Sequence, residues 1–293
     1  MNLIEFMATL KTGCEKMSGK LYVVGTPIGN LSDMSPRAIE TLKNVDFIAA
    51  EDTRVTLKLL NFFGIKNNLV SYHEHNRAEK GAQIIERLLM GENCAVVTDA
   101  GMPCISDPGE DLVAICREQN VAIEVVPGPT AAMSAVAVSG ISCSRFCFEG
   151  FLSTSKKNRF EHLESLKSEE RTMIFYEAPH KLKNTLSDFR KYFGGERRVS
   201  FCRELTKIHE QVIIMTLDEA IAYYNENDPR GEFVLVIEGA KIEKQDLTLD
   251  DCLELMLESV RSGKSKNDAA KLASKQSGFR KNELYKLLID NEE

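Results

Sequence analysis

Charged side chains follow three predicted strands at the points where the strands end. Glu51-Asp52-Thr53-Arg54 comes after residues 47–50, and Tyr176-Glu177 closes the strand predicted from residue 172. Arg203-Glu204-Leu205-Thr206-Lys207 follows residues 198–202. A carboxylate can act as a general base, and a cation can stabilise developing negative charge. The candidate catalytic residues are therefore Asp52, Arg54, Glu177, Arg203 and Lys207, although a salt-bridged rim would use the same residue types.

Three loops rich in proline and glycine follow other predicted strands. They are Gly25-Thr26-Pro27-Ile28-Gly29, the segment from Asp99 to Gly109, and Pro127-Gly128-Pro129-Thr130. None has the G-x-G-x-x-G spacing of a dinucleotide-binding turn, and proline removes the N–H donors that a phosphate site needs. Such loops suit a neutral or cationic ligand. The first loop could instead be a tight structural turn that binds no ligand. Asp99 could equally be an aspartate whose side chain only stabilises the turn. Thr130 is also a natural N-cap for the helix that follows.

The first half of the chain alternates strand, loop and helix. Strands are predicted over 20–24, 47–50, 94–98 and 122–126. Helices are predicted over 36–44, 57–63, 81–90 and 131–139, and a further helix follows Gly109 and ends at about residue 119. This alternation predicts a parallel or mostly parallel sheet with helices on its faces. In such sheets ligands lie beyond the carboxyl ends of the strands. The proline- and glycine-rich loops all lie at those ends.

The second half predicts another α/β domain and a helical tail. Strands over 145–149, 172–176, 198–202, 211–216 and 233–237, with helices between them, suggest a mixed sheet. Residues 249–260, 266–276 and 281–289 predict three short helices with helix-turn-helix spacing. The expected fold class is thus α/β with two α/β domains and a small C-terminal helical domain. The expected boundaries are 1–18 for an N-terminal extension, 19–130, 131–242, and 246–293 for the basic tail.

The composition is that of an ordinary globular protein, with 43% hydrophobic and 28% charged residues in a chain of 293. No apolar run reaches the roughly 18 residues that span a membrane, and the first 20 residues do not form a signal peptide. We therefore expect a cytoplasmic protein without membrane association. The eight cysteines include no CxxC pair, and His73-Glu74-His75 has no obvious third ligand, so we expect free thiols and no metal site.

A net charge of −7 does not favour a nucleic-acid partner, but the basic residues are clustered. Between Ser262 and Lys286 there are seven basic and two acidic residues, and residues 156–159 and 197–207 hold further clusters. Solvated helix faces are the common explanation for lysine runs, whereas three clusters on an acidic chain favour contact with a polyanion. The candidate contact residues are Lys156, Lys157, Arg159, Lys264, Lys266, Lys271, Lys275, Arg280 and Lys281.

Together the loops resemble the motifs of the tetrapyrrole methylase superfamily. The resemblance is carried by residues 21–31, 50–54, 99–103, 105–109 and 126–131, and it covers nearly the whole chain from about Gly19. Residues 176–180 and 203–207 also resemble the branch that methylates ribosomal RNA. Relatives in the superfamily carry Gly-Asp-Pro where this chain has Gly101-Met102-Pro103, and that departure fits the RNA-directed branch.

The resemblance implies S-adenosylmethionine as cofactor, folded between two α/β domains, and a homodimer. It also implies 2′-O-methylation of a cytidine ribose in the decoding region of 16S ribosomal RNA, presented as RNA or as the 30S subunit. Asp52 or Glu177 would accept the hydroxyl proton, while Arg54, Arg203 or Lys207 would hold phosphate or the alkoxide. The implied cofactor contacts are Pro27, Asp99, Ala100, Gly101, Met102, Ile105, Ser106, Thr130, Ala131, Tyr176, Glu177, Leu205, Glu232 and Phe233.

Two other functions stay open on these residues. One is a methylase of a tetrapyrrole or another non-RNA substrate on the same fold, which would not require a cationic helical tail. The other is a non-catalytic RNA-binding scaffold, which need not bind S-adenosylmethionine.

Overall fold

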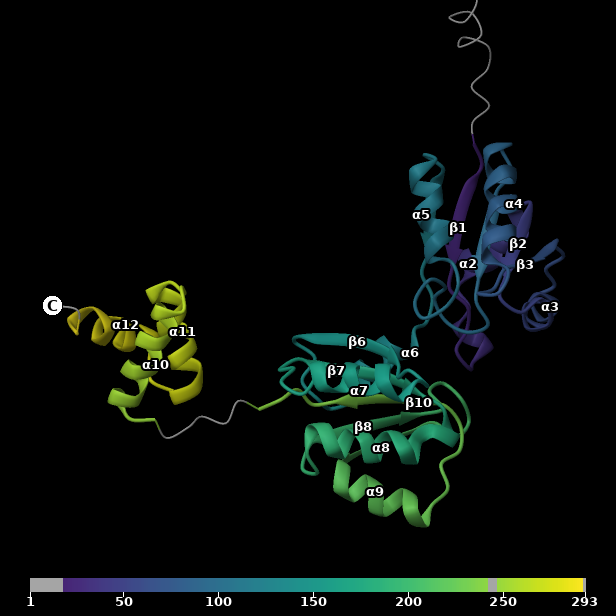
Figure 1. Cartoon of the computed structure of the whole chain (residues 1–293). Helices are drawn as coiled ribbons and strands as arrows, with labels where there is room; N and C mark the ends of the chain where they lie inside the picture. The colour runs from purple at the N-terminus through teal and green to yellow at the C-terminus, as the bar shows by residue number, and fades with distance from the viewer. Residues whose placement is uncertain (1–17, 242–246, 292–293) are drawn as a thin grey trace, which may run out of the picture. The chain divides into compact units, whose positions relative to one another are not determined.

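The computed structural model describes residues 18–241 and 247–291, and the chain forms two compact units. The first unit comprises Met1–Glu164 and Thr172–Glu238, and the second comprises Ser165–Arg171 and Gly239–Glu293. Both β-sheets belong to the first unit, and the C-terminal helices belong to the second (Figure 1). The predicted extension lies, up to residue 17, outside the described residues. The predicted boundaries at 130 and 242 stay predictions.

The first sheet is entirely parallel, as the alternation of strands and helices predicts. Its strand order is β3-β2-β4-β1-β5. The strands are β1 (Lys20–Val24), β2 (Phe47–Ala50), β3 (Leu69–Ser71), β4 (Cys94–Val97) and β5 (Ala122–Val126). All five carboxyl ends therefore lie at one edge of the sheet.

Helices cover both faces of this sheet, and apolar side chains of its strands pack against them on each face (Figure 1). Val24 and Val97 pack against α2 and α3, whereas Val23 and Val96 pack against α4 and α5. The chain thus leaves the neighbouring strands β1 and β4 toward opposite faces, which is the arrangement that opens a ligand site at the sheet edge. The elements are η1 (Leu31–Asp33), α2 (Pro36–Asn44), α3 (Thr53–Phe62), α4 (Arg77–Leu89) and α5 (Glu110–Glu118).

The second sheet is mixed, as expected, with the order β6-β7-β10-β8-β9. Only β6 and β7 run parallel; the other neighbouring pairs are antiparallel. Its strands are β6 (Phe146–Phe151), β7 (Thr172–Glu177), β8 (Arg198–Arg203), β9 (Gln211–Thr216) and β10 (Phe233–Ile237). Its helices are α6 (Ala131–Val138), α7 (Lys156–Ser165), α8 (Pro179–Phe193) and α9 (Leu217–Glu226).

The two faces of the second sheet are covered by different helices. On one face, Ile174 and Val234 pack with α6. On the other, the ring centroid of Phe175 lies 4.9 Å from that of Phe189 in α8, and Phe201 lies 5.5 Å from Tyr224 in α9. Because side chains alternate along a strand, the face on which a residue lies decides whether it can approach α6.

The C-terminal unit is a three-helix cluster of α10 (Leu249–Arg261), α11 (Lys266–Ser277) and α12 (Lys281–Asp290). Small side chains of α11, including Ala269 and Ala273, pack against Met256 and Leu288. Within the same unit, Lys275 pairs with Glu170 at 2.9 Å. Among the described residues, no helix combines the length and the apolar character that crossing a membrane requires.

Asn67 satisfies backbone carbonyls at the C-terminal end of α2. Its Nδ2 donates to the carbonyl oxygens of Leu42, at 2.9 Å, and of Val45, at 2.8 Å. Terminal helix carbonyls have no partner within the helix, so this side chain replaces the missing donors.

We expect Asn67→Ala to lower the free energy of unfolding by about 1–3 kcal/mol, because it leaves partly buried carbonyls without a donor. Chemical denaturation measures the change. The neighbouring Asn68 is exposed, so Asn68→Ala is the control and should change stability by less than about 0.5 kcal/mol. Equal effects of the two substitutions would contradict the capping role.

Candidate functional site

The loops that follow β1 and β5 touch through their backbones. A Cβ atom on Gly25 would lie 2.7 Å from both the backbone N and the Cα of Gly128, and one on Gly128 would lie 2.9 Å from Gly25. The N–H of Gly25 donates to the carbonyl of Val126 at 3.0 Å. Neither position can accept a side chain without separating the two loops.

The loop that follows β4 joins the same contact. Thr26 and Gly101 exchange two backbone hydrogen bonds, of 2.9 and 3.1 Å. The thioether of Met102 accepts the N–H of Gly128 at 3.3 Å. We call Gly25–Gly29, Asp99–Gly109 and Pro127–Thr130 the loop cluster. The sequence-based expectation that these loops converge is therefore confirmed, and the Met102 side chain connects two of them.

Elements of the second sheet complete the surroundings of the loop cluster. A Cβ atom on Gly29 would lie 2.5 Å from the Cγ of Lys207 and 2.8 Å from the Oγ1 of Thr206. A Cβ atom on Gly150 of β6 would lie 3.3 Å from the Oγ of Ser106. The loops of both sheets thus meet within one compact unit.

Tyr176, on the same face of β7 as Ile174, contacts the start of α6. Its hydroxyl oxygen accepts the N–H of Ala132 at 3.2 Å, at the start of α6. Phe148 and Phe151 make edge contacts with its ring at 5.0 and 5.4 Å. Thr130 caps the same helix, because its Oγ1 accepts the N–H of Met133, which confirms the predicted N-cap.

Backbone strain is concentrated around this site. Cys104 and Ser106 in the loop cluster have φ angles of 69° and 64°, and Glu204 and Thr206 after β8 have φ angles of 49° and 66°. Non-glycine residues rarely adopt this left-handed region, and such strain persists only where the surrounding structure imposes it. Both strained loops carry candidate residues, including Asp99 to Met102 in the first and Leu205 and Lys207 in the second.

Carboxylates gather at the ends of β2 and β4. Glu51 accepts the hydroxyl of Thr98 at 2.5 Å, and Asp99 accepts the N–H of Asp52 at 3.1 Å. Burial and the charge of Glu51 raise the pKa of Asp99, and the same two causes raise the pKa of Asp107 to about 6. Asp107 was not among the candidate site residues, because the sequence does not reveal that this loop aspartate is half-buried.

Asp52 and Arg54 form a fork-like ion pair at the end of β2. Arg54 Nε and Nη2 lie 3.0 and 2.6 Å from the two carboxylate oxygens of Asp52, which also accepts the N–H of Arg54 and so caps α3. These hydrogen bonds lower the pKa of Asp52 to about 2. Asp52 is therefore a weak base, whereas the Arg54 side chain remains 87% exposed.

Glu177 lies on the opposite face of the second sheet from Tyr176. It is 4% exposed, and its carboxylate accepts the N–H of Ala178 and the hydroxyl of Thr185 in α8. Phe233 lies beside it in register on β10 and is 2% exposed, and Arg203 follows one strand further, beside Phe233 on β8. These contacts do not support Glu177 as the proton acceptor.

Lys207 is held by two carboxylates. Its Nζ lies 2.9 Å from Glu204 and 2.8 Å from Glu232. Burial lowers the pKa of Lys207, but the two carboxylates outweigh it and the net shift is upward. Leu205 is buried in the core beneath α6. Lys207 is thus an ion-paired residue that organises its loop, and its charge is largely compensated.

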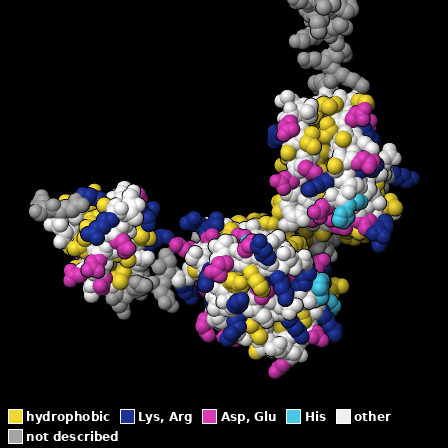
Figure 2. Space-filling view, viewed as in Figure 1, with side chains coloured by type: hydrophobic (Ala, Val, Ile, Leu, Met, Phe, Trp, Pro, Cys, Tyr) yellow, Lys and Arg dark blue, Asp and Glu magenta, His cyan; other side chains and the backbone are white. Residues whose placement is uncertain are grey.

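Several of the candidate polyanion-binding residues already have acidic partners. Arg159 is only 11% exposed and is bound to Asp188 at 2.6 Å and to Thr185 at 3.0 Å, so its predicted RNA contact is not supported. Lys157 lies 3.9 Å from Glu161. Figure 2 shows Lys and Arg side chains interspersed with acidic ones. The set that stays exposed includes Lys156, Lys264, Lys271 and Arg280.

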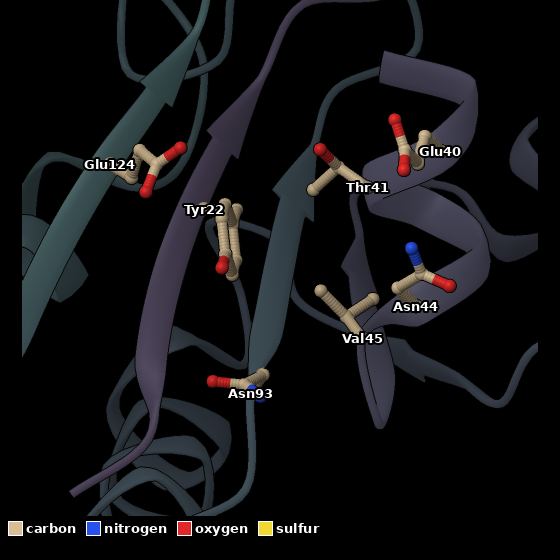
Figure 3. A pocket seen from close by; sticks show the side chains of 7 residues that line it. All are labelled: Tyr22, Glu40, Thr41, Asn44, Val45, Asn93 and Glu124. Carbon is tan, nitrogen blue, oxygen red and sulfur yellow. The ribbon is translucent and has the colours of Figure 1, made fainter. Parts of the chain in front are cut away.

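A pocket of about 280 Å³ lies elsewhere, beside α2. Figure 3 shows its lining, which is Tyr22, Glu40, Thr41, Asn44, Val45, Asn93 and Glu124. None of these residues belongs to the loop cluster. Within residues 18–241 and 247–291, no group of His, Cys, Asp and Glu side chains could hold a metal ion.

Comparison with curated proteins gives relatives with one printed name, "Ribosomal RNA small subunit methyltransferase I". The relative from Synechocystis sp. is 48% identical over 94% of this chain and 99% of its own length, and that from Escherichia coli O157:H7 is 42% identical over 95% and 97%. The relative from Thermotoga maritima is 47% identical over 75% of this chain and 99% of its own length.

Solved structures share the fold at low sequence identity. The methyltransferase CobJ has a TM-score of 0.58 at 19% identity, over 76% of this chain and 95% of its own. Uroporphyrin-III C-methyl transferase from Thermus thermophilus, complexed with S-adenyl homocysteine, has a TM-score of 0.54 at 16% identity, over 75% and 97%. Residues 20–221 match the family described as Tetrapyrrole (Corrin/Porphyrin) Methylases. The chain belongs to this tetrapyrrole methylase family, in the branch of its ribosomal RNA small subunit methyltransferase I relatives.

Proposed function

We propose that the chain uses S-adenosylmethionine to methylate the 2′-hydroxyl of a cytidine ribose in the decoding region of 16S ribosomal RNA. The observation that carries the proposal is the convergence of the three loops at Gly25, Gly101 and Gly128. The shared name of relatives more than 40% identical supports RNA as the substrate. A ribosomal substrate implies a cytoplasmic enzyme.

The chemistry of the loop cluster fits a cationic methyl donor. The charge of Glu51 raises the pKa of Asp99, and the charges of Glu51 and Asp99 raise the pKa of Asp107, so a nearby positive charge would relieve the repulsion among these carboxylates. S-adenosylmethionine supplies an activated methyl group on a positively charged sulfur. The residues that would hold it are Pro27, Asp99, Ala100, Gly101, Met102, Ile105, Ser106, Thr130, Ala131 and Tyr176, with Leu205, Glu232 and Phe233 from the second sheet.

Among these carboxylates, Asp107 has the pKa that best suits a proton acceptor. Asp52 is ionised and paired with Arg54, Glu177 faces α8, and Glu204 is paired with Lys207. A general base is most effective when its pKa lies near the working pH, and the pKa of Asp107 is about 6. The ribose hydroxyl would therefore pass its proton to Asp107 as its oxygen bonds to the methyl carbon, and the methyl–sulfur bond would break to leave a neutral thioether.

RNA would be held by exposed cations in both units. Arg54 presents a guanidinium beside the loop cluster, positioned by Asp52. In the helical unit, the acidic residues Asp250, Asp251, Glu254 and Glu258 belong to α10, whereas the lysines belong mainly to α11 and its flanks. The relative from Thermotoga maritima, which has the same printed name as the others, aligns with only 75% of this chain. We therefore assign the methyl transfer to the first unit. The second unit would add affinity for RNA.

The proposed homodimer would bury the outer side of α6. This helix reads Ala-Ala-Met-Ser-Ala-Val-Ala-Val, and a helix that is apolar all round is normally buried. Yet Met133 is 46% exposed and Val138 is 50% exposed. A second copy of the chain would cover them.

The proposal is tested by incubating the protein with labelled S-adenosylmethionine and 30S particles that lack the modification, and then mapping the label. We expect one methyl group on a ribose 2′-oxygen of a decoding-region cytidine. Label on a base, or on no RNA at all, would contradict the proposal. Incorporation into a tetrapyrrole would support the rival methylase function instead.

Gly25→Ala should weaken binding of S-adenosylmethionine, because the added Cβ pushes the β1 and β5 loops apart. We expect the dissociation constant to rise at least about tenfold, which corresponds to about 1.4 kcal/mol. Calorimetry measures the affinity, and circular dichroism checks the fold. The control is Gly81→Ala in α4, since a Cβ there makes only an ordinary contact, at 3.7 Å from the ring of Tyr72. If Gly25→Ala binds as tightly as the wild type, the loop cluster is not the cofactor site.

Asp107→Asn should remove the acidic limb of the pH profile. A base with a pKa of about 6 is ionised above that pH, so kcat/KM should rise as the pH increases through 6 and then level off. The substitution should lower kcat/KM by about 100-fold or more. Glu110→Gln, at an exposed residue of the same region, should keep the limb. An unchanged limb in Asp107→Asn would exclude Asp107 as the base.

A further inference from the structure

Phe151 is an exposed aromatic residue at the end of β6. It is 57% exposed, although the residues on either side of it in the chain, Gly150 and Leu152, are buried. Its ring is held in place by an edge contact with the ring of Tyr176, at 5.4 Å between centroids. The buried neighbours and this contact fix the ring, so that an apolar surface is presented to solvent in a defined position.

A β-bulge turns the Phe151 ring toward the face of the sheet that carries Tyr176. Side chains alternate along a regular strand, so residues 148 and 151 would otherwise lie on opposite faces. The register between β6 and β7 shifts between Phe148 and Gly150, and the rings of Phe148 and Phe151 both contact that of Tyr176. Gly150 has a φ angle of 64°, which glycine adopts without strain. Bulges next to functional sites commonly redirect a side chain in this way.

The bulge also brings Phe151 to the loop cluster. Gly150 packs so closely against Ser106 that a Cβ atom on it would lie 3.3 Å from the hydroxyl oxygen. Tyr176, on which the Phe151 ring packs, accepts the N–H of Ala132 at the start of α6. Phe151 therefore lies at the border of the proposed methyl donor site, on a strand end whose position is fixed by both contacts.

Exposed lysines follow Phe151 in the chain. Lys156 and Lys157 begin α7, whose first turn contains no acidic residue, and the side chain of Lys157 is 82% exposed. Proteins bind unpaired nucleotides with this combination, since an aromatic ring stacks on a base and nearby cations attract the phosphates. A positively charged methyl donor would gain little from these lysines. The charge beside the ring therefore favours RNA as its partner.

We propose that Phe151 stacks on a nucleobase of the RNA segment that enters the loop cluster. The inference rests on the proposed RNA methylation and deepens it, because it assigns a residue that holds the substrate base rather than the donor. Stacking would hold the nucleotide so that its ribose oxygen faces the methyl group, and such positioning supplies much of the rate of a transfer reaction. Because every base has a flat face, the contact would add affinity without selecting one base.

Substitutions at position 151 test the contact through methylation of 30S particles that lack the modification, with S-adenosylmethionine saturating. Phe151→Ala should lower kcat/KM at least about tenfold, or about 1.4 kcal/mol, which lies within the range of base–aromatic stacking. Phe151→Tyr and Phe151→Trp retain a stacking ring and should stay within about threefold of the wild type. The matched control is Phe62→Ala on α3, which removes a ring that is 65% exposed and should leave kcat/KM unchanged.

Calorimetry and sedimentation distinguish a base contact from the other ways in which the ring could act. The affinity for S-adenosylmethionine should be the same in Phe151→Ala as in the wild type. A loss of that affinity would place the ring on the cofactor, and dissociation of a dimer would place it against a second copy of the chain; either result would overturn the proposal. Unchanged kcat/KM in Phe151→Ala, or failure of both aromatic substitutions to retain activity, would overturn it as well.

Ultraviolet cross-linking tests the contact without requiring methyl transfer. The full chain is bound to the same 30S particles with S-adenosylhomocysteine, irradiated and digested with trypsin and nuclease, and the products are mapped by mass spectrometry. We expect a nucleotide attached to Phe151 within the tryptic peptide Phe146–Lys156. Absence of a nucleotide from this peptide overturns the stacking contact, even if methyl label reaches the RNA. A cross-link at Phe151 without transfer of label supports the contact and counts only against the proposed chemistry.

Discussion

Gly25 and Gly128 lie so close that their backbones are in contact, and the rest of the site depends on that contact. It arises because β1 and β5 are neighbours in the first sheet and pair in register up to Val24 and Val126. The Thr26–Gly101 bridge and the Met102 thioether then fix the β4 loop against the other two. A parallel sheet makes this arrangement possible, because all of its strands deliver their loops to one edge.

Much of the fold can be predicted from the sequence, because strong local signals mark its elements. Ser35 with Pro36 marks the start of α2, and the boundaries of β1, β2, β5, β9 and β10 agree with the expected ones. β3 was not predicted because three residues carry too little pattern. The sequence predicts a helix only from residue 57, whereas α3 begins at Thr53, where the side chain of Asp52 caps it.

The sequence predicts which loops form the site better than it predicts which side chains face it. Parallel strands require that the loops converge, and that expectation is confirmed. Tyr176 and Glu177 are adjacent in sequence, so at most one of them can face α6, and only the packing of the second sheet shows that it is Tyr176. Likewise, a count of basic residues cannot show that Lys207 and Arg159 are already neutralised by carboxylates. The burial that raises the pKa of Asp107 also depends on the folded loop.

The packing of Gly25 against Gly128 affects how such a site can be studied. A surface formed by peptide groups presents amides and carbonyls that every residue type carries, so an alanine scan, which deletes side chains, would leave most of it intact. Its chemistry would respond instead to changes in the main chain itself, such as an ester in place of an amide at Gly101 or Gly128. In this region, tolerance of side-chain replacement would reveal little about which atoms a bound molecule touches.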